Sequence, residues 1–338
     1  MKSQDPKNLV VKEAMDTTID VVLRPKSWDE YVGQDKIKRN LKIILEAAVK
    51  RQEPPDHLLF YGQAGLGKTT LASLVAQEIG AKLKITSGPA LEKMGDLAAV
   101  LTNLEPNDVI FIDEAHRLNK MIEEVLYPAM ESRKLHLIVG KGPAARTLSI
   151  DLPPFTLVAA TTRADLLSGP LRSRFGASFK LDYYENKDIE SIIKRSAALL
   201  NLKIDPQAIA QLAKASRSTP RVANRLLKRV RDFAEVKEHG VVTDNVVKEA
   251  LEMLEVDQLG LEPFDRRLLE IIIQKFNGGP VGINTLAAAL NDERGNIEDL
   301  FEPYLMSIGL LARTPAGRVV TTAAYKHLGL KSPEATLL

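Results

Sequence analysis

Short apolar runs alternate with helical patterns along the first half of the chain. Three runs, at 57–61 (HLLFY), 109–112 (VIFI) and 155–160 (FTLVAA), are bounded by polar residues. Continuous apolar runs of this length are typical of strands buried on both faces of a parallel sheet. Residues 69–79 (TTLASLVAQEI) follow the first run with apolar side chains at helical spacing. The alternation predicts an α/β domain with a parallel sheet flanked by helices.

A different pattern occupies residues 134–150. Leu135, Leu137 and Val139 alternate with polar residues before a turn at 140–143, and Thr147 and Ser149 alternate beyond it. Period-two alternation around a turn predicts a β-hairpin. Considered alone, it reads as an ordinary edge hairpin.

The second half of the chain is helical and ends in a short β-ribbon. The pattern is helical from Tyr183 to Leu254, which predicts a small all-helical lid domain. Further helices are predicted near 264–276, 283–290 and 297–307, followed by two strands around Pro315–Gly317. Helices followed by a β-ribbon indicate a winged helix, a frequent reader of nucleic acid and also a protein-contact module. We therefore predict a large α/β domain at 1–182, a lid at 183–256 and a winged helix at 257–338.

Composition excludes several classes of protein. The 338 residues include no cysteine, which excludes disulfides, thiolate metal sites and a cysteine nucleophile. No apolar run reaches the length of a bilayer span, and the first residues lack a signal-peptide core, so we expect a soluble, cytoplasmic protein without membrane contact. The formal net charge of +2 is too small to indicate nucleic-acid binding by itself, so local clusters must carry that argument.

The stretch GQAGLGKTT, at 62–70, indicates a nucleotide site. It matches the pattern G-x-x-x-x-G-K-[ST] between a predicted strand and a predicted helix, the context that a phosphate-binding loop requires. Its glycines let backbone N–H groups surround a polyphosphate, while Lys68 reaches the β and γ phosphates and Thr69 can ligate Mg²⁺. We therefore predict ATP and Mg²⁺ as cofactors.

Polar residues follow the other two strands. Asp113 and Glu114 follow the second strand, where one acid can hold Mg²⁺ and the other can polarise the attacking water, so hydrolysis is predicted. The letters DEAH also occur in another helicase superfamily, but no glycine- and arginine-rich hydrolysis motif stands near the C-terminus. Thr161 and Thr162 end the third strand and are candidates to sense the γ-phosphate. Arg172 and Arg174 follow in GPLRSRFG and read, by themselves, as two solvated arginines.

Longer motifs resemble one family closely, from about Leu23 to Leu330. They are LRPKSWDEYVGQ, GLGKTTLA, SGPALEK, FIDEAHRL, LYPAM, FTLVAATTR, STPRVANRLLKRVRDFAEV and GRVVTTAAYKHLGL. In this order they are similar to the RuvB family of AAA+ ATPases, bacterial motors that drive branch migration of Holliday junctions together with RuvA.

The resemblance implies further roles. Arg174 is similar to an arginine finger that acts on a neighbouring subunit's γ-phosphate, which implies a homo-hexameric ring. Thr162 is our choice for the first sensor, and Arg221 resembles the second. The implied nucleotide contacts are Leu23, Arg24, Gly65, Leu66, Gly67, Lys68, Thr69, Thr70, Glu131, Ser132, Arg133, Arg174, Tyr184 and Arg221. Thr69 and Asp113 are the implied metal ligands.

The resemblance also implies partners. RuvA is expected to dock on the hairpin near Leu135–Val139, RuvC is expected in the same complex, and double-stranded DNA is expected at the winged helix. Arg294, Arg313 and Arg318 are the candidate phosphate contacts.

Three positions depart from the family pattern. Gln63 and Ala64 replace two prolines in the phosphate loop, and residues 131–133 lack an acidic–aromatic pair after the glutamate. Ala316 stands where an arginine is usual.

Two other functions fit parts of the sequence. An ATP-switched loader or initiator would share the ATPase core and winged helix without processive translocation. A regulatory DNA-binding module with a decayed ATPase is less consistent with the intact Lys68, Asp113, Glu114 and Arg174.

Overall fold

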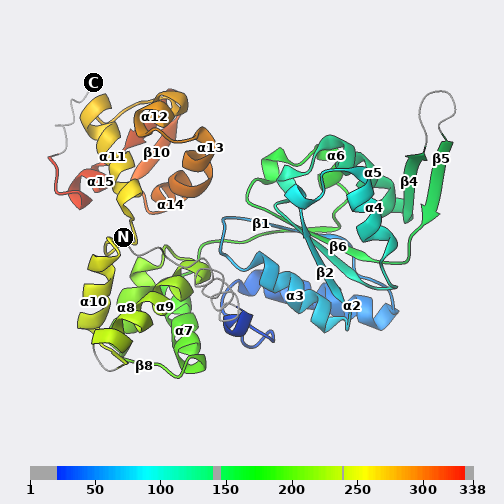
Figure 1. Ribbon diagram of the computed structural model, residues 1–338, viewed down its shortest axis with the longest axis horizontal. Coiled ribbons are helices and arrows are strands. Elements are labelled where there is room, and N and C mark those ends of the chain that lie inside the picture. Colours follow the sequence, from blue (N-terminus) through cyan, green and yellow to red (C-terminus); the bar gives the residue numbers. More distant parts are fainter. Residues whose placement is uncertain (1–20, 140–145, 238–239, 332–338) are drawn as a thin grey trace, which may run out of the picture. The chain divides into compact units, whose positions relative to one another are not determined.

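The computed structural model describes residues 21–139, 146–237 and 240–331 (Figure 1). The chain divides into two compact units, Met1–Asp188 and Ile189–Leu338. The predicted lid and winged-helix segments both belong largely to the second unit. The predicted turn at 140–143 lies outside the described residues.

A five-stranded parallel sheet forms the centre of the first unit. Its order is β2 (Leu83–Ser87), β3 (Val109–Asp113), β6 (Thr156–Thr161), β1 (Leu58–Tyr61) and β7 (Ala177–Lys180). The parallel sheet predicted from the apolar runs is confirmed. Because the strands are parallel and nearly in register, their carboxyl ends lie along one edge of the sheet and their amino ends along the other.

Helices cover both faces of this sheet (Figure 1). On one face lie α2 (Asp35–Arg51) and α3 (Lys68–Glu78); on the other lie α4 (Met94–Thr102), α5 (Lys120–Ser132) and α6 (Gly169–Arg172). Successive strand side chains point to opposite faces, so Ile110 and Ile112 join the core under α4 and α5 while Phe111 is buried on the opposite face. Burial on both faces explains why the strands read as continuous apolar runs.

The predicted hairpin is present. β4 (Lys134–Val139) pairs antiparallel with β5 (Arg146–Asp151), and the pair projects from the sheet domain next to α5 (Figure 1). Short 3-10 turns, η1 (Gly88–Ala90), η2 (Ala115–Arg117) and η4 (Ala164–Leu166), complete the loops of this unit.

The lid is built from α7 (Asn186–Leu199), α8 (Pro206–Ala215), α9 (Pro220–Lys237) and α10 (Asp244–Met253). A pair of two-residue strands, β8 (Lys203–Ile204) and β9 (Val241–Val242), adds to the helices that the sequence predicts.

The winged helix follows the predicted order. It contains α11 (Pro263–Phe276), α12 (Ile283–Leu290), a third helical stretch, and the ribbon β10 (Leu311–Thr314) and β11 (Gly317–Val320). The third stretch runs through α13 (Arg294–Asn296), the π-helical η5 (Ile297–Phe301) and α14 (Glu302–Ser307). The short helix α15 (Thr322–His327) ends the domain.

Candidate functional site

The phosphate loop joins β1 to α3, as predicted. Gly62, Gly65 and Gly67 have φ values of 142°, 82° and 96°, in the region that side chains disfavour. A Cβ at Gly62 would lie 2.5 Å from the carbonyl oxygen of Leu181, so only glycine fits there. The loop therefore leads into the N-terminus of α3 with backbone N–H groups available to an anion.

Lys68 begins α3 and is 8% exposed. Its ammonium donates to the carbonyl oxygens of Gly62 at 2.7 Å and Gln63 at 2.8 Å. The positive charge is thus held over the loop itself. Thr69 and Thr70 stand in the first turn of α3 and are half-buried.

Two tyrosines support this loop from behind. The hydroxyl of Tyr184 lies 3.2 Å from the Leu66 carbonyl oxygen and 3.2 Å from the hydroxyl of Tyr31. A Cβ at Gly67 would lie 3.0 Å from the Tyr31 hydroxyl, and one at Gly33 would lie 2.7 Å from the Tyr184 ring. Burial raises the pKa of Tyr184 to about 12, so both phenols stay protonated at neutral pH and can donate hydrogen bonds.

The structure thus brings the predicted contact Tyr184 to the loop and adds Tyr31, which sequence reasoning missed. Tyr31 stands inside the motif LRPKSWDEYVGQ, and that position was its only signal. At the start of the same motif, Leu23 is buried at 2% exposure and Arg24 is exposed.

The predicted acids end β3 at the same edge of the sheet. Asp113 is half-buried and accepts the backbone N–H of Glu114 at 2.9 Å. Glu114 has φ 49° and ψ 42°, a left-handed conformation that turns the chain sharply and leaves its carboxylate exposed. That carboxylate pairs with Arg117 at 3.0 Å.

The two threonines after β6 have different surroundings. Thr161 is 1% exposed, and its hydroxyl contacts Nδ1 of His116 at 3.0 Å and accepts the N–H of Arg163 at 2.9 Å. Thr162 is half-exposed beyond the strand end. The Thr161 hydroxyl is therefore occupied by contacts within the fold. His116 of the DEAH letters belongs to this strand-end packing.

Arg174 stands at the opposite edge of the sheet. It precedes β7, whereas the phosphate loop follows β1, and Leu58 is in register with Ala177. The four residues of β1 rise about 3.3 Å each, so ~13 Å separates the two edges. The guanidinium lies 2.9 Å from Glu131, donates to the Pro170 carbonyl at 2.6 Å and stacks 4.5 Å over the Tyr127 ring.

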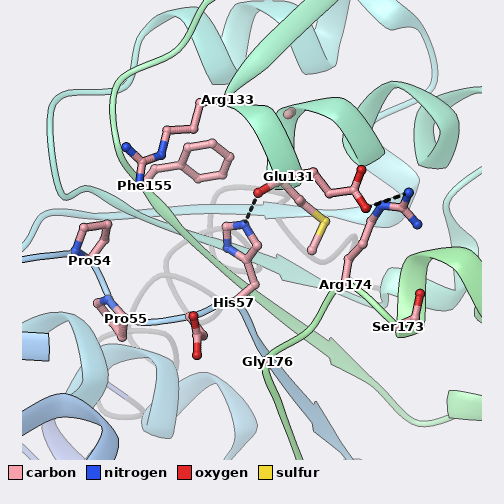
Figure 2. Close-up of a pocket in the computed structure, with 12 residues that line it drawn as sticks. Pro54, Pro55, His57, Glu131, Arg133, Phe155, Ser173, Arg174 and Gly176 are labelled. Carbon is pink, nitrogen blue, oxygen red and sulfur yellow. Dashed lines mark hydrogen bonds and ion pairs between the residues drawn. The ribbon is translucent and has the colours of Figure 1, made fainter. Parts of the chain in front are cut away.

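A cavity of about 460 Å³ opens beside this arginine (Figure 2). Glu131, Arg133 and Arg174 line it together with His57 and Phe155. The predicted nucleotide contacts at the end of α5 are therefore grouped with Arg174, away from the phosphate loop of the same chain. Ser132 is exposed next to them, and its hydroxyl donates to the Pro128 carbonyl at 2.9 Å.

His57 fixes this edge. Its Nδ1 accepts the N–H of Leu157 at 2.9 Å, so Nε2 carries the hydrogen and donates to the Met130 carbonyl at 3.2 Å (Figure 2). Burial lowers the pKa of His57, which agrees with a neutral ring. The imidazole thereby ties the start of β6 to the end of α5, immediately before Glu131.

Three family models match consecutive stretches of the chain. They are the Holliday junction DNA helicase RuvB P-loop domain over 23–181, the RuvB AAA lid domain over 184–257 and the RuvB C-terminal winged helix domain over 258–329. The solved structure of the Thermotoga maritima RuvB Holliday junction branch migration motor is 49% identical, with a TM-score of 0.86, and the alignment covers 92% of this chain and 100% of that chain. The chain belongs to the RuvB family.

Variants of the same Thermotoga protein align equally well. One with a threonine replaced by valine has 49% identity and a TM-score of 0.86, covering 92% of this chain and 100% of that one. One with an arginine replaced by alanine has 49% identity and a TM-score of 0.84, covering 92% and 99%. Since the likeness spans ATPase, lid and winged helix, the chain is an ATP-hydrolysing branch-migration motor of the RuvB family, and the loader or initiator is not favoured.

The predicted DNA contact at Arg318 requires correction. This residue is 6% exposed; its Nε donates to Glu302 at 2.7 Å, and its Nη2 lies 3.0 Å from Glu298. Burial lowers the pKa of Arg318, but the hydrogen bonds and charges of Glu302 and Glu298 outweigh that effect and raise it. A buried guanidinium held by two carboxylates is not presented to a DNA phosphate.

Arg294 and Arg313 remain at the surface, 57% and 55% exposed. Both approach Glu298, at 3.0 Å and 3.8 Å. Burial raises the pKa of Glu298, but hydrogen bonds and charges from Arg294 and Arg318 outweigh it and hold the pKa below its usual range. The tip residues Thr314 to Ala316 are exposed and uncharged.

The expected exposure of the apolar residues on the first hairpin strand also requires correction. Leu135 is 0% exposed and belongs to the core beneath α5, and Leu137 is half-buried against that core. Neither presents the exposed apolar surface that we expected, and the side chain of Val139 lies outside the described residues. Across the ladder Leu148 faces Leu137 and is 50% exposed, so the apolar face of the hairpin continues outward through Leu148.

Arg221 lies in the second unit, exposed in the first turn of α9. Among the described residues no helix combines the length and apolarity needed to cross a membrane.

Proposed function

We propose that this chain hydrolyses Mg²⁺-ATP at the phosphate loop and uses the energy to move duplex DNA through Holliday junctions. One observation carries the proposal. The phosphate loop, the acids and the threonines converge on one edge of the sheet, while Arg174 stands on the other.

Each group at the carboxyl edge has a role in hydrolysis. Lys68 and the loop N–H groups hold the phosphates, Thr162 senses the γ-phosphate, and Glu114 orients and polarises the attacking water. Thr69 and Asp113 offer the hard oxygen ligands that suit Mg²⁺ at this edge. When bound, the ion neutralises charge on the β and γ phosphates.

Arg174 acts on the nucleotide of a neighbouring copy. It cannot reach the loop of its own chain across the sheet, and Glu131 to Arg133 share its position. A homo-hexameric ring would place this edge against the next subunit's γ-phosphate, where an arginine stabilises transition-state charge.

Further residues of the chain are proposed to contact the nucleotide. Leu23, Arg24 and Tyr184 contact the adenine side, and Arg221 reports the nucleotide state to α9 as the second sensor. Tyr184 supports this role because its hydroxyl touches the loop at Leu66.

DNA and protein partners bind elsewhere on the chain. Arg294 and Arg313 are surface cations suited to DNA phosphates, which gives affinity without base sequence. RuvA docks on the hairpin and RuvC joins the same complex, all in the cytoplasm. Exposed Leu148 supports the hairpin assignment.

A branch-migration assay tests the proposal. Purified chain, RuvA, ATP and Mg²⁺ are mixed with a labelled synthetic four-way junction, and dissociation into duplex arms is followed. We expect arms to form only with ATP and RuvA, with DNA-stimulated phosphate release. Nucleotide-dependent DNA binding without sustained turnover or arm formation would favour the loader instead.

A further inference from the structure

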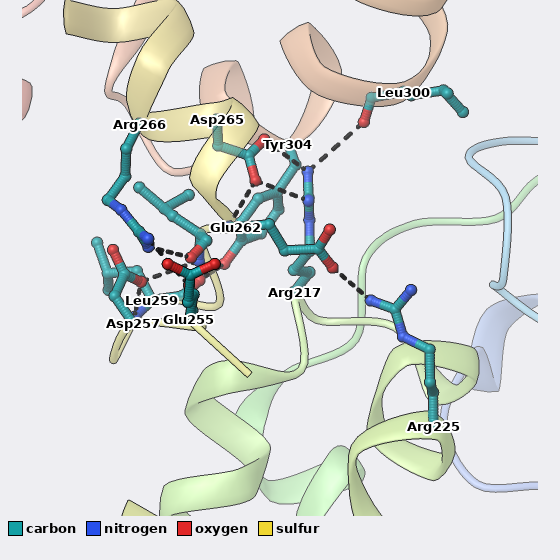
Figure 3. Close-up of polar contacts among 11 residues, drawn as sticks. Arg217, Arg225, Glu255, Asp257, Leu259, Glu262, Asp265, Arg266, Leu300 and Tyr304 are labelled. Carbon is teal, nitrogen blue, oxygen red and sulfur yellow. Dashed lines mark hydrogen bonds and ion pairs between the residues drawn. The ribbon is translucent and has the colours of Figure 1, made fainter. Parts of the chain in front are cut away.

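Arg217 links the lid to the winged helix. It lies in the connection between α8 and α9, and its guanidinium donates twice to Asp265 of α11, at 3.0 Å and 3.3 Å (Figure 3). The Asp265 side chain is fully buried, and that of Arg217 is 12% exposed. A bidentate pair in such surroundings fixes orientation as well as distance.

The same guanidinium contacts the third helical stretch of the winged helix. It stacks 4.6 Å over the Tyr304 ring and reaches the Leu300 carbonyl at 3.5 Å. The Tyr304 hydroxyl donates to the Leu259 carbonyl at 2.5 Å (Figure 3). One lid side chain therefore touches two helical segments of the winged helix.

The connecting segment 254–262 is itself fastened. A carboxylate oxygen of Asp257 accepts the N–H groups of Leu259 and Leu261 at 2.8 Å and 2.9 Å. Arg266 donates to the carbonyls of Leu261 and Glu255 at 2.7 Å and 3.0 Å. These hydrogen bonds hold the connecting segment as a clamped joint.

The backbone on the lid side of this joint adopts a rarely populated conformation. Arg217 and Ser218 both have φ 53°, a conformation that side chains rarely adopt and that surrounding contacts must maintain. A Cβ at Gly260 would lie 2.4 Å from the Ala215 carbonyl oxygen, so the joint packs directly against the end of α8.

We propose that Arg217 is the positioning residue that makes the winged helix move with the lid. Arg221, the proposed nucleotide sensor, follows four residues later, so lid movement in response to ATP is delivered to the DNA-binding domain through the Arg217–Asp265 joint. This inference rests on the proposed function, since it assumes that nucleotide moves the lid.

Distance measurements test the joint without relying on activity. The chain has no cysteine, so labels can be placed at exposed positions through Val236→Cys in α9 and Lys275→Cys in α11. In the full-length parent we expect one narrow label-to-label distance by electron spin resonance, unchanged between ADP and a non-hydrolysable ATP analogue. In Arg217→Ala the distribution should broaden.

Three further variants sharpen the test. Arg217→Lys should also broaden the distribution, since lysine cannot bind a carboxylate bidentately. Arg217→Met combined with Asp265→Asn removes the joint without leaving a buried charge alone, so it should fold and still broaden. Arg225→Ala, which removes an exposed 2.5 Å pair with Glu262, is the matched control and should behave like the parent.

Activity supplies a second readout. Junction arms formed per ATP hydrolysed should fall ~10-fold in Arg217→Ala and in the double variant, because the buried pair no longer fixes the joint. Phosphate release itself should stay close to that of the parent. Narrow distances with parental arms per ATP in both variants would overturn the proposal. If the parent migrates no junctions, the proposed function fails, while the distances still decide whether Arg217 fixes the joint.

Discussion

Nη2 of Arg174 lies 2.9 Å from Oε1 of Glu131, so the proposed finger is paired within its own chain. Its Nε is buried without a hydrogen-bond partner among the described residues. The finger must leave Glu131 to reach a phosphate on a neighbouring subunit, which makes its action dependent on assembly.

Complementation tests action between subunits. Arg174→Ala and Lys68→Ala should each lose hydrolysis by ~10³-fold or more, yet mixing them should restore part of it. Mixed rings contain interfaces that join an intact loop to an intact finger. The measurement is phosphate release against mixing ratio; no recovery in rings shown to be mixed would place the finger in its own subunit.

Variants at the carboxyl edge of the sheet should separate ATP binding from ATP hydrolysis. Glu114→Gln keeps the phosphate cradle but removes the base that polarises water, so ATP should bind while turnover falls ~10²-fold or more. Lys68→Ala should weaken ATP binding itself. Equilibrium binding and steady-state turnover of both variants provide the check, and parental turnover in Glu114→Gln would contradict its assignment.

At the hairpin, Leu148→Glu should abolish stimulation by RuvA while basal ATPase activity stays near the parental value. Leu148 is the half-exposed end of an apolar face that is buried at Leu135. Ser149→Glu on the other face of β5 is the matched control, measured by pull-down and ATPase assay. Retained binding in Leu148→Glu would move the RuvA contact elsewhere.

The winged-helix arginines should divide into two classes. Removing Arg313 should weaken binding to all duplex sequences about equally and reduce the salt slope by ~0.9. Ala316→Arg adds a cation at the exposed tip and should steepen that slope. Duplex affinity against salt gives both values, and parallel unshifted lines would remove the tip from the DNA interface.

Arg318→Ala should instead destabilise the winged helix by ~3–5 kcal/mol, because it leaves two carboxylates, Glu302 and Glu298, without their shared partner. Denaturant unfolding followed by circular dichroism should show an early loss of this domain. A stable fold with a reduced salt slope would return Arg318 to the DNA surface.

The stability of the large domain should depend on His57 in mild acid. Because burial lowers the pKa of His57 below its ordinary 6.5, the unfolded chain binds a proton that the folded domain excludes. The contribution of the neutral His57 ring to the free energy of unfolding is complete above about pH 6.5. It is lost as the pH falls through the lower pKa that His57 has in the folded domain.

Urea unfolding followed by the fluorescence of Trp28, the single tryptophan, reads this domain directly. His57→Gln should flatten the decline in stability between neutral pH and pH ~5. His136→Gln, at an exposed hairpin position, should leave the decline unchanged. Equal declines in the parent and His57→Gln would assign the pH dependence to other groups.

The sequence by itself determined the parts whose chemistry is local. Gly62 to Thr69 carry their own turn geometry, and continuous apolar runs can satisfy burial only as central strands, so the loop and parallel sheet were predictable. The grouping of the polar residues at the strand ends was also predictable, because parallel strands bring their carboxyl ends to one edge of the sheet. The longer motifs indicated the family to which the chain belongs.

Tertiary structure alone decided which charged and apolar side chains are exposed to a binding partner and which are buried. Arg313 and Arg318 look alike in the sequence, but Glu302, sixteen residues away on α14, buries one and not the other. Arg217 likewise gained its role from Asp265, forty-eight residues later. The position of an arginine in the sequence does not show whether a distant carboxylate will pair with it. That pairing forms only when separate helices pack together.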